Sequence, residues 1–133
     1  MGANPMRMSA IDHDLAVAAI SHLPLLAAAA LVESVAGDSE RWPLARLLAA
    51  GSWRDMTRLA RGDEVMGADI IATNARPIAA SLRAYRDAID GWLTELDAMA
   101  DESRPVVPDA ASVARLRGRL EGARDQLERE SAP

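Results

Sequence analysis

The stretch HDLAVAAISHLP, residues 13–24, holds both histidines of the chain, and each has a polar neighbour. His13 precedes Asp14, and Ser21 precedes His22. An imidazole ring can donate or accept a hydrogen bond near neutral pH, and its neighbours set which nitrogen carries the proton. The other residues of the stretch are apolar apart from its final proline, so these polar groups interrupt what otherwise reads as an apolar helix. The stretch is therefore a first candidate for a binding site.

A second candidate is the segment GSWRDMTR, residues 51–58, in which a carboxylate and a guanidinium lie three positions apart. On a helix, Asp55 and Arg58 share one face and can form an ion pair. A guanidinium can also bind a ligand carboxylate through two parallel charge-assisted hydrogen bonds. From spacing alone, an ordinary surface ion pair is the commoner explanation. His22 falls on an apolar stripe, where a histidine is more often part of the packing than a ligand contact.

The composition excludes several classes of protein. At 133 residues the chain fits a single domain, and its net charge of −5 without a basic stripe argues against a nucleic-acid partner. It has no cysteine, which fits a cytoplasmic protein, and two histidines without clustered carboxylates predict no metal site. The apolar run from Leu15 to Gly37 raises the question of a membrane segment, but Ser21, His22, Pro24 and Glu33 interrupt it, so we expect a soluble chain.

The first expected helix begins at Ser9, because Ser9 and Asp12 have the spacing of a capping box, and it ends at Gly37. Pro24 lacks a backbone N–H and crowds the carbonyl of Ile20, which predicts a kink beside Ser21 and His22. We expect Ser21 and the freed carbonyl of Ile20 to orient the His22 ring. The residues at helical spacing that predict one apolar stripe are Leu15, Ala18, Ala19, His22, Leu26 and Ala29.

The middle of the chain predicts shorter helices. Pro43 near a first turn and Gly51 as a stop indicate a short helix. Ser52 and Asp55 again have capping-box spacing, and Asp63 can cap a further helix that runs to Asn74.

Two heptad-like patterns follow. The first has apolar residues at Ile78, Leu82, Tyr85, Ile89, Trp92, Leu96 and Met99, and the second at Val113, Leu116, Leu120, Ala123 and Leu127. The Pro-rich segment SRPVVPD separates them, which predicts an antiparallel helical hairpin. The expected fold class is all-α, a helical bundle with a kinked long first helix and a C-terminal helical hairpin, intertwined as a dimer. Trp42, Trp53 and Trp92 are candidate core or interface anchors, and their sequence context leaves both roles open.

Four segments together resemble the prephenate dehydrogenase family, which includes the arogenate dehydrogenases of tyrosine biosynthesis. They are HD, then SHLP after six residues, then GSWRDMTR and a segment of the form M-x-x-D-I-x-x-x-N. The resemblance covers the C-terminal helical domain of that family, here residues 11–133. It implies that residues 1–10 are the linker and tail of a preceding nucleotide-binding domain. The residues that carry it are His13, Asp14, Ser21, His22, Leu23, Pro24, Gly51, Asp55, Thr57, Arg58, Met66, Asp69, Ile70 and Asn74.

The resemblance implies an NAD- or NADP-dependent oxidative decarboxylation of prephenate, or of arogenate, by the two-domain enzyme. The nucleotide-binding domain would hold the cofactor and the catalytic histidine, so this chain alone would bind no cofactor, carry no catalytic residue and be inactive. By the same resemblance, the chain would supply homodimerisation and substrate binding. The substrate-binding residues would be Arg58, His22, Asp55, Gly51, Thr57 and Ser21, and the residues of the domain junction would be His13, Asp14, Pro24 and Asn74.

Two positions depart from the family pattern. Many members have a second histidine directly after SHLP, where this chain has Leu25, and a tryptophan after the methionine, where it has Gly67. These departures favour an alternative, a non-catalytic dimerisation or adaptor module derived from the same domain. The retained Gly51, Asp55, Thr57 and Arg58 favour the enzyme. A helix lying on a membrane surface is a weaker third reading, because the chain has no basic face.

Overall fold

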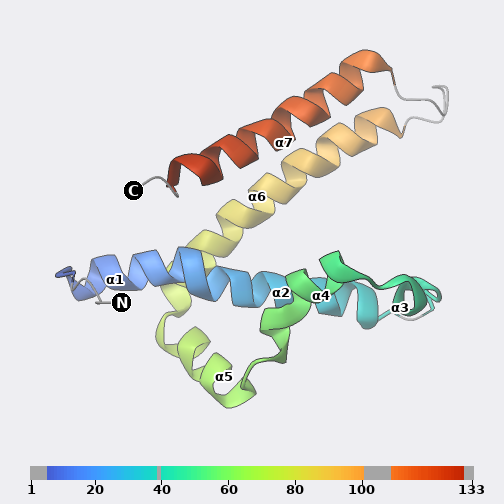
Figure 1. Ribbon diagram of the computed structural model, residues 1–133. Helices are drawn as coiled ribbons and strands as arrows, with labels where there is room; N and C mark the ends of the chain where they lie inside the picture. Colours follow the sequence, from blue (N-terminus) through green and yellow to red (C-terminus); the bar gives the residue numbers. More distant parts are fainter. Residues whose placement is uncertain (1–5, 39, 101–108, 131–133) are drawn as a thin grey trace. The chain divides into compact units, whose positions relative to one another are not determined.

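A computed structural model describes residues 6–38, 40–100 and 109–130, and these residues form helices and connections with no β-strand (Figure 1). The expectation of an all-α fold is confirmed. The chain divides into an N-terminal unit, Met1–Tyr85, and a C-terminal unit, Arg86–Pro133, which are described separately below. In chain order the elements are α1 (Ala10–Val17), the π-helical turn η1 (Ala18–His22), α2 (Leu23–Ala36), α3 (Ala45–Leu48), α4 (Gly51–Thr57), the 3-10 turn η2 (Arg58–Arg61), α5 (Glu64–Thr73), α6 (Ala75–Met99) and α7 (Ala110–Glu130).

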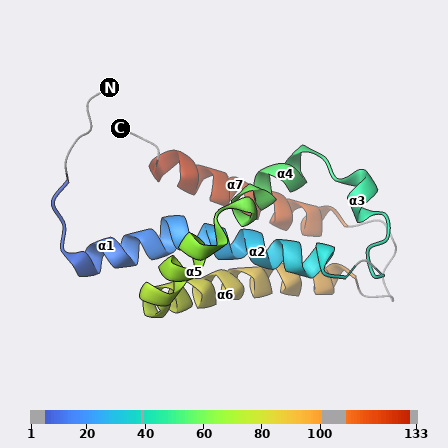
Figure 2. The same ribbon diagram turned by 90° about the horizontal axis from the view of Figure 1, so that it is seen from below.

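The first helix starts where its capping residues predict. Ser9 has extended backbone angles, and its hydroxyl oxygen accepts a hydrogen bond from the Asp12 amide at 3.1 Å. The Ser9 hydroxyl donates in turn to the Asp12 carboxylate at 2.7 Å. This exchange satisfies an amide that would otherwise lack a partner in the first turn. From there α1, η1 and α2 form one run that ends before Gly37, as expected (Figure 2).

The interruption expected at Pro24 takes the form of a π-helical turn just before the proline. Within η1, the Leu23 amide donates to the Ala18 carbonyl, five residues back instead of four. Pro24 has no amide to donate, so the regular ladder cannot continue through this point. The extra residue in the turn also moves the preceding side chains around the helix axis. The single stripe predicted from sequence therefore fails at Leu15 and Ala19, which are exposed, whereas Ala18 is fully buried.

The run Ala10–Ala36 is long and apolar enough to cross a membrane by length and composition alone, with a mean hydropathy of 2.2 in its most apolar window. Core helices of soluble proteins and signal sequences have the same property. Only 11% of that window is buried within the chain.

The segment after α2 departs from the sequence expectation in two places. Gly51 begins α4 instead of ending the short helix α3, which already ends at Leu48. Ser52 therefore lies inside α4, where its backbone is helical, and the expected capping box with Asp55 does not form; Ala50 holds the cap position instead. The cap at Asp63 is confirmed, since its carboxylate accepts from the Met66 amide at 2.8 Å.

The N-terminal unit packs mainly through small residues. Helix α2 lies against α4 and η2, and the buried apolar side chains of the unit are Ala18, Ala28 and Ile78. Thr57 is also buried, and its hydroxyl donates to the Trp53 carbonyl at 2.7 Å. Small side chains allow helix backbones to approach closely, but each one removes little apolar surface from water.

The C-terminal unit contains an antiparallel pair formed by the second part of α6 and α7. The Arg119 guanidinium lies 4.1 Å from the centre of the Trp92 ring and donates to the Ala88 carbonyl at 3.1 Å. Gly91 makes room for it, because an added Cβ would lie 2.7 Å from an Arg119 nitrogen. One turn earlier on α7, Arg115 lies 3.4 Å from the carboxylate of Glu95, which comes later on α6 than Ala88 and Trp92. The two helices are therefore antiparallel, which confirms the expected hairpin. Most of its Pro-rich connection, residues 103–108, lies outside the described residues.

Helix α7 is capped by the last residue of that connection. The Asp109 carboxylate accepts from the Ser112 amide and from the Ser112 hydroxyl, each at 2.8 Å. The hydrogen bond from the Ser112 amide, followed by the one from its hydroxyl, lowers the pKa of Asp109 below the ordinary 3.8. An ionised carboxylate at a helix N-terminus accepts these bonds better than a protonated one does.

One apolar face of α6 is partly exposed among the described residues. We call it the α6 face, and its residues are exposed by 38–53%: Leu82, Tyr85, Ile89, Leu93 and Leu96. Four of them come from the expected heptad pattern. The pattern therefore identifies an apolar helix face, and each of its five side chains keeps part of its surface exposed among the described residues.

Candidate functional site

Three of the expected site residues, Asp14, His22 and Asn74, are in contact with one another through the Asn74 side chain. The side-chain nitrogen Nδ2 of Asn74 lies 2.8 Å from the backbone oxygen of Asp14 and 3.2 Å from Nδ1 of His22. Asn74 is only 8% exposed, and His22 is half-buried. Sixty residues separate Asn74 from Asp14, so this contact joins the end of α1 and the π-helical turn to the junction of α5 and α6.

Local structure explains how Asn74 reaches this position. Helix α5 ends at Thr73, and Asn74 leaves helical geometry with φ −116° and ψ 26° while its amide still bonds to the Ile70 carbonyl. The side chain is thereby directed away from the continuing helix. We expected Ser21 and the carbonyl of Ile20 to orient the His22 ring, but Ser21 is exposed and the ring contact is made by Asn74. An asparagine directly after a helix end was the sequence signal for this role.

His13 and the side chain of Asp14 lie outside this contact. Nδ1 of His13 is 3.2 Å from the Asp14 carboxylate, and the two side chains are 59% and 56% exposed. An exposed pair of this kind contributes little to stability. Asp14 therefore takes part in two separate contacts, with its backbone oxygen facing Asn74 and its carboxylate facing His13.

Arg58 is the first residue of η2, the turn that packs against α2, and its side chain is exposed. Asp55 is exposed as well, and no ion pair within 4.0 Å joins the two residues in the described part of the chain. The pairing expected from their three-residue spacing is therefore absent, because α4 gives way to a 3-10 turn between them. The Arg58 guanidinium remains accessible to an external anion.

Two more of the expected substrate-binding residues lie close by in the chain. The Thr57 hydroxyl is used within its own helix, where it donates to a carbonyl one turn back. At Gly51, an added Cβ would meet nothing within 4 Å, so packing within the chain does not require a glycine there. Space beside the backbone at this position is compatible with a ligand or a second domain.

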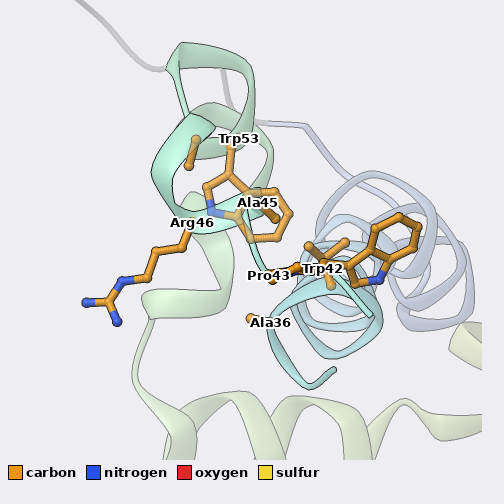
Figure 3. Close-up of a pocket in the computed structure, with 8 residues that line it drawn as sticks. Ala36, Trp42, Pro43, Ala45, Arg46 and Trp53 are labelled. Atoms are coloured by element: carbon orange, nitrogen blue, oxygen red, sulfur yellow. The ribbon is translucent and has the colours of Figure 1, made fainter. Parts of the chain in front are cut away.

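A cavity of about 530 Å³ lies at a different place in the N-terminal unit, between the end of α2, α3 and the start of α4 (Figure 3). Neither His22 nor Arg58 lines this cavity, so it is separate from both of these candidate binding residues. In the close-up the Arg46 side chain extends away from the indole of Trp53. The lining residues are Val35, Ala36, Trp42, Pro43, Ala45, Arg46, Ala49 and Trp53.

Metal ligands are not gathered anywhere in the described ranges, which contain no cluster of three or more His, Cys, Asp or Glu side chains suited to an ion. The candidate binding groups discussed above are the imidazole of His22, the amide of Asn74 and the guanidinium of Arg58. Such groups bind and orient oxygen-rich ligands through hydrogen bonds.

Comparison with known proteins shows which proteins share these features. The family model described as prephenate dehydrogenase, dimerization domain, matches residues 9–104. The prephenate dehydrogenase of Bacillus subtilis (strain 168) is 35% identical over 95 residues, which cover 71% of this chain and 24% of that protein. The prephenate dehydrogenase of Lactococcus lactis subsp. cremoris (strain MG1363) is 34% identical over 67 residues, which cover 50% of this chain and 19% of that protein.

Among solved structures, the arogenate dehydrogenase of Synechocystis matches with a TM-score of 0.71 and 32% identity over 90% of this chain and 41% of that one. The chain thus spans about a quarter or less of the two curated relatives and under half of this structural relative. The sequence motifs, the helical architecture and the extent of the family match all indicate the same family. The chain belongs to the family of prephenate dehydrogenase dimerization domains.

Proposed function

We propose that this chain is the dimerisation and substrate-binding half of a cytoplasmic prephenate or arogenate dehydrogenase. The proposal is supported by the names of its relatives and by the share of their length that it matches. A nucleotide-binding domain, preceding the linker at residues 1–10, supplies the remainder of the enzyme. We assign residues 11–133 to the helical domain, which acts without nucleic acid or membrane.

The proposed reaction is the oxidative decarboxylation of prephenate, in which the ring carboxylate is lost as carbon dioxide and the ring becomes aromatic; NAD or NADP would be the oxidant. The product is 4-hydroxyphenylpyruvate. The described residues do not fit the cofactor: they contain no strand followed by a glycine turn, and none of their glycines has a positive φ. NAD or NADP is therefore assigned to the other domain, together with the catalytic histidine.

The contribution of this chain is to hold an anionic substrate. Arg58 is the proposed carboxylate ligand, because its guanidinium is exposed and is not paired with Asp55. His22 is the proposed second contact, with Ser21, Gly51, Asp55 and Thr57 around them. The observation that carries this assignment is the contact of the His22 ring with Asn74, which holds the imidazole in a defined orientation beside the π-helical turn.

The remaining motif residues serve the domain junction in this proposal. His13 and Asp14 face solvent at the start of the helical domain, where the nucleotide-binding domain would lie. Pro24 and Asn74 maintain the irregular turn and its contact. The α6 face is the proposed homodimer surface, since a helix face of five exposed apolar residues is of the kind that a second copy covers.

The test is reconstitution of activity. The chain is mixed with a separately expressed nucleotide-binding half, and reduction of NAD or NADP is followed by absorbance with prephenate and then with arogenate. Reduction that depends on both halves and on one substrate supports the proposal. The proposal is contradicted if the two halves form a complex but this complex reduces neither NAD nor NADP with either substrate.

An alternative function is a non-catalytic dimerisation module, and one contact favours it. The two departures from the family pattern are neighbours, because a Cβ at Gly67 would lie 3.7 Å from Cδ2 of Leu25. An imidazole and an indole expected in one small region are thus replaced together by an apolar contact. The double variant Leu25→His, Gly67→Trp separates the two functions, because activity that appears only in this variant identifies the natural chain as non-catalytic.

A further inference from the structure

We infer that Asn74 is a positioning residue that fixes the tautomer of His22, making the outward nitrogen Nε2 of the ring a hydrogen-bond donor. The inference concerns the chemistry that His22 offers to a ligand, and its functional meaning rests on the proposed role in substrate binding. It follows from two contacts of the Asn74 side chain and from the exposure of the His22 ring.

The first step is the orientation of the Asn74 amide. An amide side chain has a donating nitrogen and an accepting oxygen, and its orientation is settled by its surroundings. Here the nearest partner is the Asp14 backbone oxygen at 2.8 Å, which can only accept. The donating NH₂ group must therefore face Asp14. Rotating the amide by half a turn would bring two oxygens into contact.

The second step transfers this constraint to the imidazole. The same NH₂ group has a second hydrogen, and Nδ1 of His22 lies 3.2 Å from its nitrogen. A neutral imidazole has one protonated and one unprotonated nitrogen. Because Asn74 presents a donor, Nδ1 accepts and Nε2 carries the hydrogen. The Asp14 backbone carbonyl thus determines the orientation of the Asn74 amide, and the amide determines the tautomer of the His22 ring.

The third step concerns what Nε2 faces. The described residues contain no buried side-chain nitrogen or oxygen that lacks a hydrogen-bond partner. Nε2 makes no hydrogen bond within the described part of the chain, and His22 is only half-buried, so this nitrogen is open to solvent. The ring therefore offers an N–H group outward without needing a positive charge.

A ring fixed in this way selects its ligand by chemistry. An outward N–H donor binds oxygen acceptors, such as the carboxylate, carbonyl or hydroxyl oxygen of a small organic anion, and is a poor partner for an ammonium or amide donor. The same tautomer withholds Nδ1 from a metal ion or from proton abstraction. Within the proposed function, His22 is thus a neutral donor that supplements the charged Arg58.

The test is the tautomer itself, measured by NMR on the ¹⁵N-labelled chain at about pH 8, above the ordinary histidine pKa of about 6.5. Long-range proton–nitrogen correlations distinguish a protonated from an unprotonated ring nitrogen. We expect His22 to show protonated Nε2 and unprotonated Nδ1 as a single tautomer. His13 is the internal contrast, because its Nδ1 lies 3.2 Å from the Asp14 carboxylate and therefore faces an acceptor instead of a donor.

Variants at position 74 then test the cause. Asn74→Ala removes the donor, and we expect the two His22 nitrogens to move towards the averaged values of a short unstructured histidine peptide measured at the same pH. Asn74→Asp places an acceptor beside Nδ1, and we expect the opposite tautomer to dominate. Thr73→Ala is the matched control, since the Thr73 hydroxyl bonds only to its own helix and the His22 spectrum should not change.

Two results would overturn the inference: protonated Nδ1 in the natural chain, or an unchanged His22 spectrum in folded Asn74→Ala. If circular dichroism shows that the variants do not fold, the spectrum of the natural chain decides alone. The measurement uses neither cofactor nor substrate, so its failure is distinct from failure of the proposed enzymatic function.

Discussion

The two units of the chain use their side chains in different ways. In the N-terminal unit, alanines are buried, and Asn74 and Thr57 are satisfied inside the packing. In the described part of the C-terminal unit, Ser112 is the buried side chain, and Arg119 and Arg115 hold α7 to α6 from its flank. Both units leave leucines exposed, but the leucines of the α6 face, Leu82, Leu93 and Leu96, lie on one side of a single helix.

This difference indicates a division of labour. A binding site needs side chains fixed by their neighbours, and the N-terminal unit provides that for the His22 ring. A dimer interface needs apolar surface that only a partner covers, and the α6 face provides that. The following experiments alter one side of this comparison at a time, beginning with the largest expected effect.

Charging the α6 face should abolish the proposed dimer. Leu93 and Leu96 are 53% and 51% exposed. At about 1.5–3 kcal/mol for full burial of each leucine, the half that remains to be covered on both copies amounts to about 3–6 kcal/mol. We expect Leu93→Glu with Leu96→Glu to weaken dimerisation at least a hundredfold in sedimentation equilibrium.

The matched control adds the same charges elsewhere on α6. Thr94→Glu with Ala98→Glu places two glutamates on exposed positions of the helix away from the α6 face, and the association constant should stay the same. If both pairs weaken association equally, net charge and not the α6 face governs the dimer.

Removing the proposed carboxylate ligand should have the next largest effect. In the reconstituted enzyme, Arg58→Ala should raise the KM for prephenate about 10- to 150-fold, because a charge-assisted hydrogen-bonded contact contributes about 1.5–3 kcal/mol. The KM for NAD should not change. Arg61→Ala, in the same 3-10 turn, is the control. Equal KM values for Arg58→Ala and the natural enzyme would remove Arg58 from the site.

Enlarging a buried alanine tests the tight packing of the N-terminal unit. Ala28 is 3% exposed on α2, the helix that packs against α4 and η2. Ala28→Leu should lower the free energy of unfolding by about 1–3 kcal/mol, because the added atoms force neighbouring helices apart. Urea denaturation gives the value. Ala30→Leu, an exposed position on α2, should change it little, and a similar loss in both variants would contradict tight packing at Ala28.

The smallest expected effect concerns the cap of α7. The hydrogen bonds from Ser112 lower the pKa of Asp109 below 3.8, so their stabilising contribution is present above about pH 4 and is lost as the pH falls through the lowered pKa. We expect the Ser112 amide to lose protection from hydrogen exchange as the pH falls below 3.8, relative to Asp109→Asn at the same pH. The asparagine variant does not titrate, so equal pH dependence in the two chains would exclude Asp109 as the cause.

The helices were predictable wherever local chemistry decides them. Ser9 and Asp63 cap helices in the structure because a side chain and an amide three residues apart need no other partner. The same spacing at Ser52 and Asp55 gave a wrong prediction, because α4 begins at Gly51 and Ser52 lies within the helix. A capping pattern shows that a helix end is possible, but neighbouring residues decide where the helix begins.

The candidate site was predictable only as a set of residues. The family motifs contain Asp14, His22 and Asn74, but nothing in their spacing gives a contact across 52 residues. The apolar stripe through Leu15 failed for a similar reason, since a π-helical turn depends on how the helix packs as well as on Pro24.

That turn has a consequence for how the sequence tolerates insertions and deletions. Each helical residue advances the chain by about 100° around the helix axis. The additional residue in Ala18–His22 therefore changes which side chains before and after the turn lie on the same face of the helix. Losing a single alanine there would leave a more regular and still apolar helix, yet it would rotate the Asp14 carbonyl away from Asn74. A relative with a one-residue gap at this place would keep the fold and lose the anchor of its histidine.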